Sequence, residues 1–362
     1  MKVLHVLALG GAGGIESLCA DIAQYSQDEN HFYFLWGGGN NADKIKSFQC
    51  NVVIRNFTYS NIWKEYQCFR SYITDKGIEC IVIQGVSPVM LLYFRMVLKK
   101  YSNLKGCLYL HANSEDLFSR KWVKWLFQWA GKQADGYIAI SDSVRNSMKG
   151  ICDISQIHRI YNGVSCKKFD KRTARIEHNI IQLIYVGRIV RRKGLFLLIE
   201  ALKEITLPYE LTIIGEGSDK EELRQEIRRA GISEKVNLPG TQWNIEEWLT
   251  KADVFVHPAT WQEGFGITLI EAMSAGLPCI AFRRGAIPEI ITDNVDGYLV
   301  EPVNEQAYKE KLNEVIRQWQ TEPETFAAIA KNARKRAECF DIQVYVKELS
   351  EYLSQIVYGA CV

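Results

Sequence analysis

Two glutamates eight positions apart, Glu263 and Glu271, are the side chains in this sequence best suited to hold sugar hydroxyls. The apolar residues from Ile267 to Met273 have helical spacing, and the pattern stops at Gly276-Leu277-Pro278. We therefore predict that Glu263 lies in a loop and Glu271 one turn inside a helix. Because a helix N-terminus exposes unpaired N–H groups, a phosphate would bind there between the two carboxylates. For the pair alone, a surface loop with two solvated glutamates explains the pattern equally well.

Four cations within six residues form a second candidate element, in the segment from Gly187 to Gly194. It directly follows the strand-like run Ile180–Val186, and parallel sheets bind ligands beyond the carboxyl ends of their strands. A guanidinium and an ammonium at that edge, those of Arg188 and Lys193, would suit a pyrophosphate. A solvated basic turn is the alternative for this loop alone. Taken with the two glutamates, the loop indicates a sugar-nucleotide site.

With these motifs, the chain resembles the retaining GT-B glycosyltransferases of family four over nearly all of its 362 residues. The resemblance rests on an ordered series of short motifs, each of them weak alone. In chain order the series is Gly10–Glu16, His111 after a strand, Ile138–Ser141, Asn162–Val164, Arg188 with Lys193, Ile214–Gly217, Ala252–Pro258, the two glutamates and Pro288–Ile291.

The resemblance implies an α/β protein of two Rossmann-like parallel-sheet domains that face each other across a cleft. It also implies a hexosyltransferase that uses a nucleotide diphosphate sugar, with UDP favoured over GDP. The acceptor would be a hydroxyl of a glycan, lipid-linked or protein molecule, and the anomeric configuration would be retained. The nucleotide diphosphate would leave from the front face of the sugar and take the acceptor's proton, so no enzyme nucleophile is needed. The family's usual work suggests bacterial envelope or capsule polysaccharide synthesis.

The same resemblance assigns roles to individual residues. Glu263 would position the sugar hydroxyls, and His111 would contact a hydroxyl of the donor sugar. Arg188 and Lys193 would stabilise the leaving phosphate, and Glu16 would point to the acceptor. The residues expected to bind the donor are Gly13, Gly14, Gly187, Gly215, Glu216, Gly266, Ile267, Thr268 and Glu271, the last of them at the ribose.

We expect no metal and no cofactor. The chain has no Asp-x-Asp, and the histidines other than His111, at positions 5, 31, 158, 178 and 257, form no pair with metal-ligand spacing. Arg188, Lys193 and the helix dipole would then neutralise the phosphate charge in place of a divalent cation.

Composition agrees with a folded two-domain protein. A chain of 362 residues is too long for one ordinary core. Its net charge of +2 argues against nucleic acid as a partner, because phosphate-backbone binding normally shows as a strongly basic face. The ten cysteines are scattered without any Cys-x-x-Cys, as expected of reduced thiols, so we expect a cytoplasmic protein.

Strand-length apolar runs alternate with helical patterns, which predicts βαβ units and parallel sheets. In the first half we expect strands at 3–9, 31–36, 80–84, 107–111 and 137–140. A polar linker at about 165–178 precedes further strands at 182–186, 210–214, 235–238, 254–257, 278–282 and 297–300. We therefore place an acceptor-binding domain at 1–168 and a nucleotide-sugar-binding domain at 178–340. The resemblance implies that the last helix, 341–358, packs back on the first domain.

An aromatic stripe in the first half has two interpretations. Phe118, Trp122, Trp125 and Trp129 would share one helical face, with basic residues nearby. Such a stripe is more often core, but it also suits the headgroup layer at the inner face of a membrane. We favour core and keep peripheral membrane contact as the alternative.

Three other functions are alternatives to a glycosyltransferase. A dinucleotide-binding loop needs Gly-x-Gly-x-x-Gly, and counted from Gly11 the last position is Glu16, whose side chain would prevent close helix packing. If the loop Gly10–Glu16 does not bind a dinucleotide, it is either a loop that approaches the donor phosphate or the acceptor, or a buried tight turn without a ligand. A silent partner subunit on the same fold would have lost a glutamate or a clamp cation, yet all four are present. An enzyme that modifies the sugar nucleotide, such as an epimerase, would need an acid or base near the sugar, and His111 leaves that open.

Overall fold

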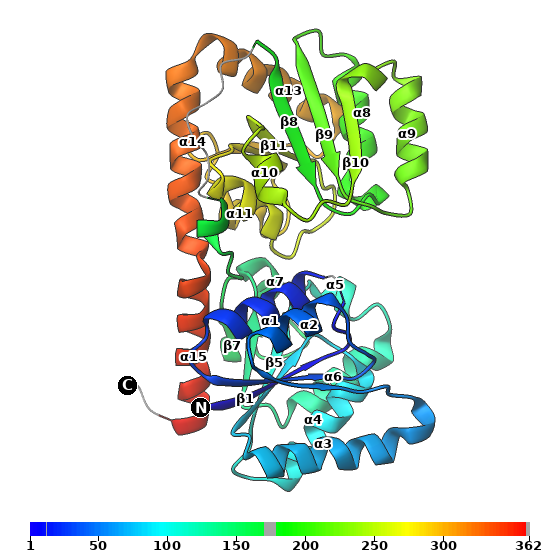
Figure 1. The fold of residues 1–362 in the computed structure, drawn as a ribbon, viewed down its shortest axis with the longest axis vertical. Coiled ribbons are helices and arrows are strands. Elements are labelled where there is room, and N and C mark those ends of the chain that lie inside the picture. Colours follow the sequence, from blue (N-terminus) through cyan, green and yellow to red (C-terminus); the bar gives the residue numbers. More distant parts are fainter. Residues whose placement is uncertain (12, 170–178, 360–362) are drawn as a thin grey trace. The chain divides into compact units, whose positions relative to one another are not determined.

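The computed structural model describes residues 1–11, 13–169 and 179–359, which form two compact α/β units (Figure 1). The first unit comprises Met1–Gly163 with Ile342–Val362, and the second comprises Val164–Asp341. Residues 164–168, which the sequence analysis assigned to the first domain, lie in the second unit. The greater part of the expected linker, residues 170–178, lies outside the described residues.

The first unit is built on a parallel sheet with the strand order β3-β2-β1-β4-β5-β6-β7. Its strands are β1 (Lys2–Leu7), β2 (Glu29–Phe34), β3 (Asn51–Ile54), β4 (Cys80–Gln84), β5 (Lys105–Leu110), β6 (Gly136–Ala139) and β7 (Ile157–Arg159). The sequence analysis missed β3 and β7. Both are short edge strands with several partly exposed residues, so neither has the apolar run that identifies a central parallel strand.

Eight helices belong to this unit within the part of the chain that the structure describes. They are α1 (Gly14–Tyr25), α2 (Asn40–Ser47), α3 (Ile62–Lys76), α4 (Pro88–Lys100), α5 (Ser114–Leu117), α6 (Lys121–Gly131), α7 (Asp142–Ser147) and α15 (Ile342–Tyr358). The last of them contacts α1, and its Tyr352 hydroxyl donates a 3.2 Å hydrogen bond to the Tyr137 carbonyl of β6. The C-terminal helix is therefore part of the first unit's core.

The second unit has a parallel sheet with the order β10-β9-β8-β11-β12-β13. Its strands are β8 (Ile181–Val186), β9 (Tyr209–Ile214), β10 (Val236–Gly240), β11 (Val254–His257), β12 (Cys279–Phe282) and β13 (Tyr298–Val300), all within two residues of their predicted bounds. The helices are α8 (Leu195–Lys203), α9 (Lys220–Arg229), α10 (Ile245–Leu249), α11 (Ile267–Ser274), α12 (Ile287–Ile290), α13 (Glu305–Thr321) and α14 (Pro323–Ala337).

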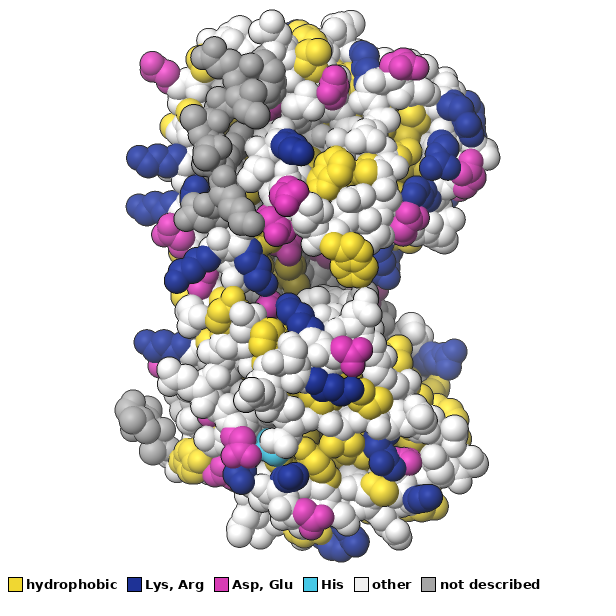
Figure 2. Space-filling model, viewed as in Figure 1, with side chains coloured by type: hydrophobic (Ala, Val, Ile, Leu, Met, Phe, Trp, Pro, Cys, Tyr) yellow, Lys and Arg dark blue, Asp and Glu magenta, His cyan; other side chains and the backbone are white. Residues whose placement is uncertain are grey.

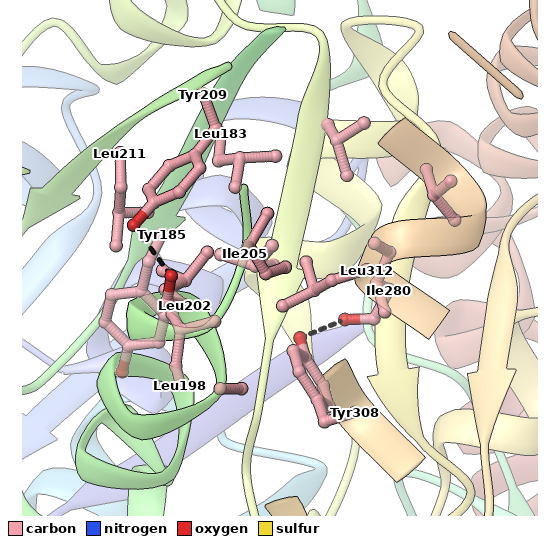
Figure 3. Close-up of a cluster of buried hydrophobic side chains, with 14 of the residues drawn as sticks. Leu183, Tyr185, Leu198, Leu202, Ile205, Tyr209, Leu211, Ile280, Tyr308 and Leu312 are labelled. Carbon is pink, nitrogen blue, oxygen red and sulfur yellow. Dashed lines mark hydrogen bonds between the residues drawn. The ribbon is translucent and has the colours of Figure 1, made fainter. Parts of the chain in front are cut away.

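Two buried tyrosines join helices to this sheet (Figure 3). The Tyr209 hydroxyl donates to the Leu202 carbonyl at 3.0 Å, and the Tyr308 hydroxyl donates to the Ile280 carbonyl at 2.9 Å. Around them pack Leu198, Leu211 and Leu312. Since each hydroxyl has a partner, the large rings are buried without leaving an unsatisfied polar group, and they hold α8 and α13 against the strands.

In both sheets the first strand lies inside the sheet and is flanked by the next strand on one side and a later strand on the other. β1 pairs with β2 and β4, and β8 pairs with β9 and β11. Open α/β sheets bind ligands at such reversals of strand order, beyond the carboxyl ends of the strands. Each unit therefore offers one such edge, and the motifs follow the strands that form it.

The surface carries both signs of charge. Figure 2 shows lysine and arginine side chains interspersed with aspartate and glutamate on the face that it draws. Within the described residues, no helix is both long and apolar enough to cross a membrane. The nine cysteines described there are all free thiols.

Candidate functional site

Two loops meet at the reversal point of the second sheet. The loop after β8 ends at Gly194, where an added Cβ would lie only 1.8 Å from the Pro258 carbonyl oxygen in the loop after β11. The Thr260 N–H donates to the Arg192 carbonyl at 3.3 Å between the same two loops. Only glycine permits this approach, and at Gly194 the backbone also has φ +75°. The functional side chains on the two loops are thereby brought together.

Loops after the neighbouring strands extend the same edge. Gly215, after β9, has φ +140°, and an added Cβ there would lie 1.9 Å from the Gly187 carbonyl oxygen. The loop after β12 contacts the glutamate loop through the Ala286 N–H, which donates to the Glu263 carbonyl at 2.9 Å. Four loops therefore gather at one edge of one sheet.

An ion pair joins the two central loops. The Lys193 ammonium donates to Glu263 Oε2 at 2.7 Å, and the two side chains are 14% and 13% exposed. The indole N–H of Trp261 donates to the same oxygen at 3.0 Å. The sequence analysis placed Lys193 and Glu263 in separate motifs, and the structure brings them into contact.

The Glu263 carboxyl is ionised. Burial alone raises its pKa, but the neighbouring His257 and the Lys193 ammonium outweigh burial and hold the pKa well below its usual range. Burial lowers the pKa of His257, so that ring is neutral near pH 7, and its Nε2 lies 3.6 Å from Glu263 Oε2. An ionised carboxylate only accepts hydrogen bonds, so Glu263 suits binding of hydroxyl groups rather than proton donation.

Trp261 is a site residue that the sequence analysis missed. It donates to Glu263, and the Arg192 guanidinium lies 3.7 Å from the centre of its ring. A buried indole N–H needs an acceptor, and Trp261 stands two residues before a carboxylate. That spacing was the available signal.

Arg188 takes no part in this ion pair. Its side chain is exposed and forms no ion pair within the described ranges, while its backbone carbonyl accepts a 3.0 Å hydrogen bond from the Tyr185 hydroxyl. The loop is thus fixed at its backbone while the guanidinium projects into solvent.

Helix α11 begins where the sequence predicted. It starts at Ile267 after Gly266, which has φ +105°, and no side chain caps its N-terminus. Glu263 precedes the helix and Glu271 lies one turn inside it, so the predicted placement is confirmed. The uncapped start, with the backbone of Gly266, Ile267 and Thr268, has the features of an anion-binding helix end.

Glu216 makes a different contact from the one expected of a donor ligand. It is exposed, and it accepts a 2.6 Å hydrogen bond from Lys220, one turn further along the chain. Its neighbour Gly215 touches the loop after β8, so this turn borders the site through its backbone.

In the first unit, the Gly-rich loop connects β1 to α1, and its Ala12 lies outside the described residues. Glu16 folds back over the loop, so that a Cβ added to Gly13 would lie 2.2 Å from Glu16 Oε2. A carboxylate in the first turn is favoured by the helix dipole. A phosphate at Gly13 and Gly14 would meet this charge, whereas a sugar hydroxyl would find an acceptor.

His111 directly follows β5. Its Nε2 lies 2.7 Å from Gln84 Oε1, and its ring stacks on Tyr109 with centroids 4.3 Å apart. Burial lowers the pKa of His111 to about 3, so the imidazole is neutral. Among the described residues, no three His, Cys, Asp or Glu side chains form a group that could hold a metal ion.

The structure does not place the aromatic stripe in the core as the sequence analysis favoured. Helix α6 begins at Lys121, so Phe118 lies outside it. Trp122 and Trp125 are 51% and 64% exposed, and core was therefore wrong for both. Trp129 is partly buried beneath the Arg95 guanidinium, 4.3 Å from its ring centre.

Two family models match consecutive parts of the chain. The model for Glycosyltransferase Family 4 matches residues 12–168, and the model for Glycosyl transferases group 1 matches residues 167–336. A crystal structure of HepE from Anabaena in complex with UDP superposes with a TM-score of 0.84 at 21% identity, covering 98% of this chain and all of that one.

Curated relatives are similar over part of their length. The amylovoran biosynthesis glycosyltransferase AmsK of Erwinia amylovora is 29% identical over 215 residues, which are 57% of this chain. The alpha-maltose-1-phosphate synthase of Mycobacterium tuberculosis is 28% identical over 235 residues, or 59% of this chain. The matched regions span 52% and 60% of these two relatives.

Proposed function

The chain belongs to the glycosyltransferases of family four and has the GT-B fold, and on that premise we propose that it transfers a hexose from a nucleotide diphosphate sugar to a hydroxyl with retention of configuration. The observation that carries this proposal is the Lys193–Glu263 pair at the reversal point of the second sheet. A cation for phosphate and an ionised acceptor for hydroxyls stand side by side there. These are the two chemistries that a sugar nucleotide presents.

The donor would lie along the carboxyl edge of the second sheet. Lys193 has three N–H donors and gives one to Glu263, so two remain for phosphate oxygens. The N-terminus of α11 would bind the same phosphate, and Glu271 would accept hydrogen bonds from the ribose. A UDP-sugar is the favoured donor, since HepE is similar over its whole length and binds UDP in its crystal structure.

Catalysis would be electrostatic. Charge develops on the leaving phosphate oxygen, where Lys193 and Arg188 stabilise it, and the acceptor hydroxyl passes its proton to that phosphate. Glu263 is fixed by two donors at one oxygen and stays ionised, so it orients sugar hydroxyls instead of attacking the anomeric carbon. His111, a neutral ring at the edge of the first sheet, would contact a sugar hydroxyl.

The reaction needs no metal in this proposal. Two cationic side chains and an uncapped helix N-terminus supply the positive charge that a divalent ion supplies in other transferases. The relative AmsK is a glycosyltransferase of amylovoran biosynthesis. The proposed acceptor is therefore a glycan, either lipid-linked or on a protein, and the proposed pathway is synthesis of a bacterial envelope or capsule polysaccharide. Glu16 would face this acceptor.

A donor panel tests the proposal. The protein is incubated with UDP- and GDP-sugars and lipid-linked or oligosaccharide acceptors in excess EDTA, and nucleotide release is measured with the anomeric coupling of the product. We expect acceptor-dependent release from at least one donor and an α-linked product from an α-linked donor. An inverted product, or activity that is lost in EDTA and restored by magnesium or manganese, contradicts the mechanism. Conversion of the nucleotide sugar without any acceptor would instead indicate an epimerase.

A further inference from the structure

A line of hydrogen-bonded side chains crosses the first sheet and ends at His111. His111 Nε2 lies 2.7 Å from Gln84 Oε1, and Gln84 Nε2 lies 2.9 Å from His5 Nδ1. His5 Nε2 in turn lies 3.0 Å from Asn30 Oδ1, and Asn30 Nδ2 donates to the Asp28 carbonyl at 3.0 Å. The line therefore passes from the end of β5 through β4 and β1 to β2.

The middle of this line is buried. His5 is fully inaccessible to solvent, and Gln84 and Asn30 are almost so. Burying an amide or an imidazole in a parallel sheet is unfavourable unless its polar atoms are paired, and apolar residues would fill these positions more stably. The three buried members, His5, Gln84 and Asn30, each have a partner on both sides, as a fully connected buried network requires. The expected reason for keeping such a network is a task at one of its ends.

One fixed acceptor sets the direction of every hydrogen bond in the line. The Asp28 carbonyl can only accept, so the Asn30 amide nitrogen faces it and Asn30 Oδ1 accepts from His5 Nε2–H. Burial lowers the pKa of His5 to about 4, so the ring is neutral and its Nδ1 is a bare acceptor. Gln84 then donates through Nε2 and accepts through Oε1, which leaves His111 as the donor at Nε2.

These directions determine which nitrogen of His111, at the end of the line, carries the proton. His111 is neutral, so with its proton on Nε2 its other ring nitrogen, Nδ1, carries a lone pair. Nδ1 has no hydrogen-bond partner within the described part of the chain. The ring is stacked on Tyr109, which limits its rotation. At the carboxyl edge of the first sheet the protein thus presents one oriented acceptor.

We propose that Gln84 is a positioning residue which, with His5 and Asn30 behind it, holds His111 in the Nε2–H tautomer so that Nδ1 accepts a hydrogen bond from a substrate hydroxyl. The hydroxyl's identity rests on the function proposed above, in which His111 contacts the donor sugar. The tautomer itself does not depend on that function. In the opposite tautomer His111 would present a donor, and a hydroxyl would have to turn its lone pair to the ring.

Nitrogen-15 NMR of the histidine rings tests the tautomer directly. We expect the wild-type protein near pH 7 to show His111 protonated at Nε2 and bare at Nδ1. His31 bonds to Tyr72 and Glu29 in the same unit, outside the line, and serves as an internal reference for the native fold. A wild-type His111 that is protonated at Nδ1, or that is charged, overturns the proposal without any variant being needed.

Gln84→Met, which keeps the side-chain volume, then tests the positioning role. With the His31 signals unchanged, we expect the His111 signals to move toward a mixture of tautomers. Turnover of the nucleotide sugar should fall roughly 10- to 100-fold in kcat/KM, because misorientation of a contact group has effects of that order. Affinity for the free nucleotide should stay the same. The control is Gln67→Met on the exposed face of α3, which should change neither readout.

The outcomes separate this proposal from the one it builds on. A Gln84→Met protein with an unchanged His111 tautomer, or with a changed tautomer and normal kcat/KM, contradicts the role of Gln84. A wild-type protein with the expected tautomer that releases nucleotide from no donor contradicts the proposed function alone.

Discussion

At the scale of single residues, Lys193 and Glu263 stabilise each other as an ion pair. A carboxylate with 13% of its side chain exposed is unfavourable unless it is paired, and Lys193 and Trp261 both donate to the same oxygen. In the proposed mechanism, the ammonium that this pairing holds in place stabilises the charge on the leaving phosphate. The pair thus has a structural role without ligand and would have a catalytic role with it.

We predict that Lys193→Ala lowers turnover about 10²-fold or more, because one preorganised donor to a developing charge contributes about 3 to 4 kcal/mol. The control is Lys309→Ala, which removes another lysine with a carboxylate partner, Glu204, from the surface of the second unit. Steady-state kinetics and thermal unfolding of both variants check this. A folded Lys193→Ala protein with near-normal turnover would show that the leaving-group role is wrong.

The sequence predicted candidate site residues but not the contacts between them. Glu263 and Lys193 were recognisable by motif, but they are 70 positions apart, and their contact depends on β8 pairing with β11. Trp261 was missed although its partner Glu263 stands only two residues away, because the spacing does not show that the loop turns the indole N–H toward the carboxylate. The sequence did not reveal the line from His111 to Asn30, since three members come from three different strands and His111 directly follows a fourth.

At the scale of elements, apolar runs predicted the central strands well because both faces of a parallel sheet are buried. Helix α11 was predicted from its period and from the Gly276-Leu277-Pro278 stop. The prediction that four aromatic residues share one helical face was wrong, because the chain turns between α5 and α6, at residues 118–120. Periodicity alone does not reveal such a break, and it does not say which side of a helix faces the core.

Helix α6 instead presents Trp122 and Trp125 to solvent, with Arg120, Lys121 and Lys124 around them. Exposed indoles among basic residues suit an anionic headgroup layer. Burying about 100 Å² of apolar surface contributes about 2.5 kcal/mol, so loss of the two indoles would weaken membrane binding by more than about tenfold.

We predict that the protein sediments with vesicles containing phosphatidylglycerol, and less with purely zwitterionic ones. Replacing Trp122 and Trp125 together by Ala should reduce this binding about tenfold or more. Trp243, which is 80% exposed in the second unit, provides the matched control as Trp243→Ala. Equal binding by the double variant and the control would rule out α6 as the membrane contact.

At the scale of the whole molecule, the chain consists of two units with the same plan and different edges. The reversal point of the second sheet carries an ion pair and an uncapped helix start, whereas that of the first carries Glu16 and the neutral His111. Phosphate suits the environment in the second unit, and hydroxyl groups suit the environment in the first unit. The central claim is therefore that the nucleotide of the donor is bound by the second unit.

Isothermal titration of free UDP or GDP, whichever base the donor panel selects, tests that claim most directly. Glu271→Gln should weaken nucleotide binding about 10-fold to 100-fold, because one hydrogen bond to a charged group contributes about 1.5 to 3 kcal/mol. Glu263→Gln and His111→Asn should leave the affinity unchanged, since their proposed partners belong to the sugar, which the free nucleotide lacks. Equal affinity in all three variants, or a loss confined to His111→Asn, would contradict the assignment of the nucleotide to the second unit.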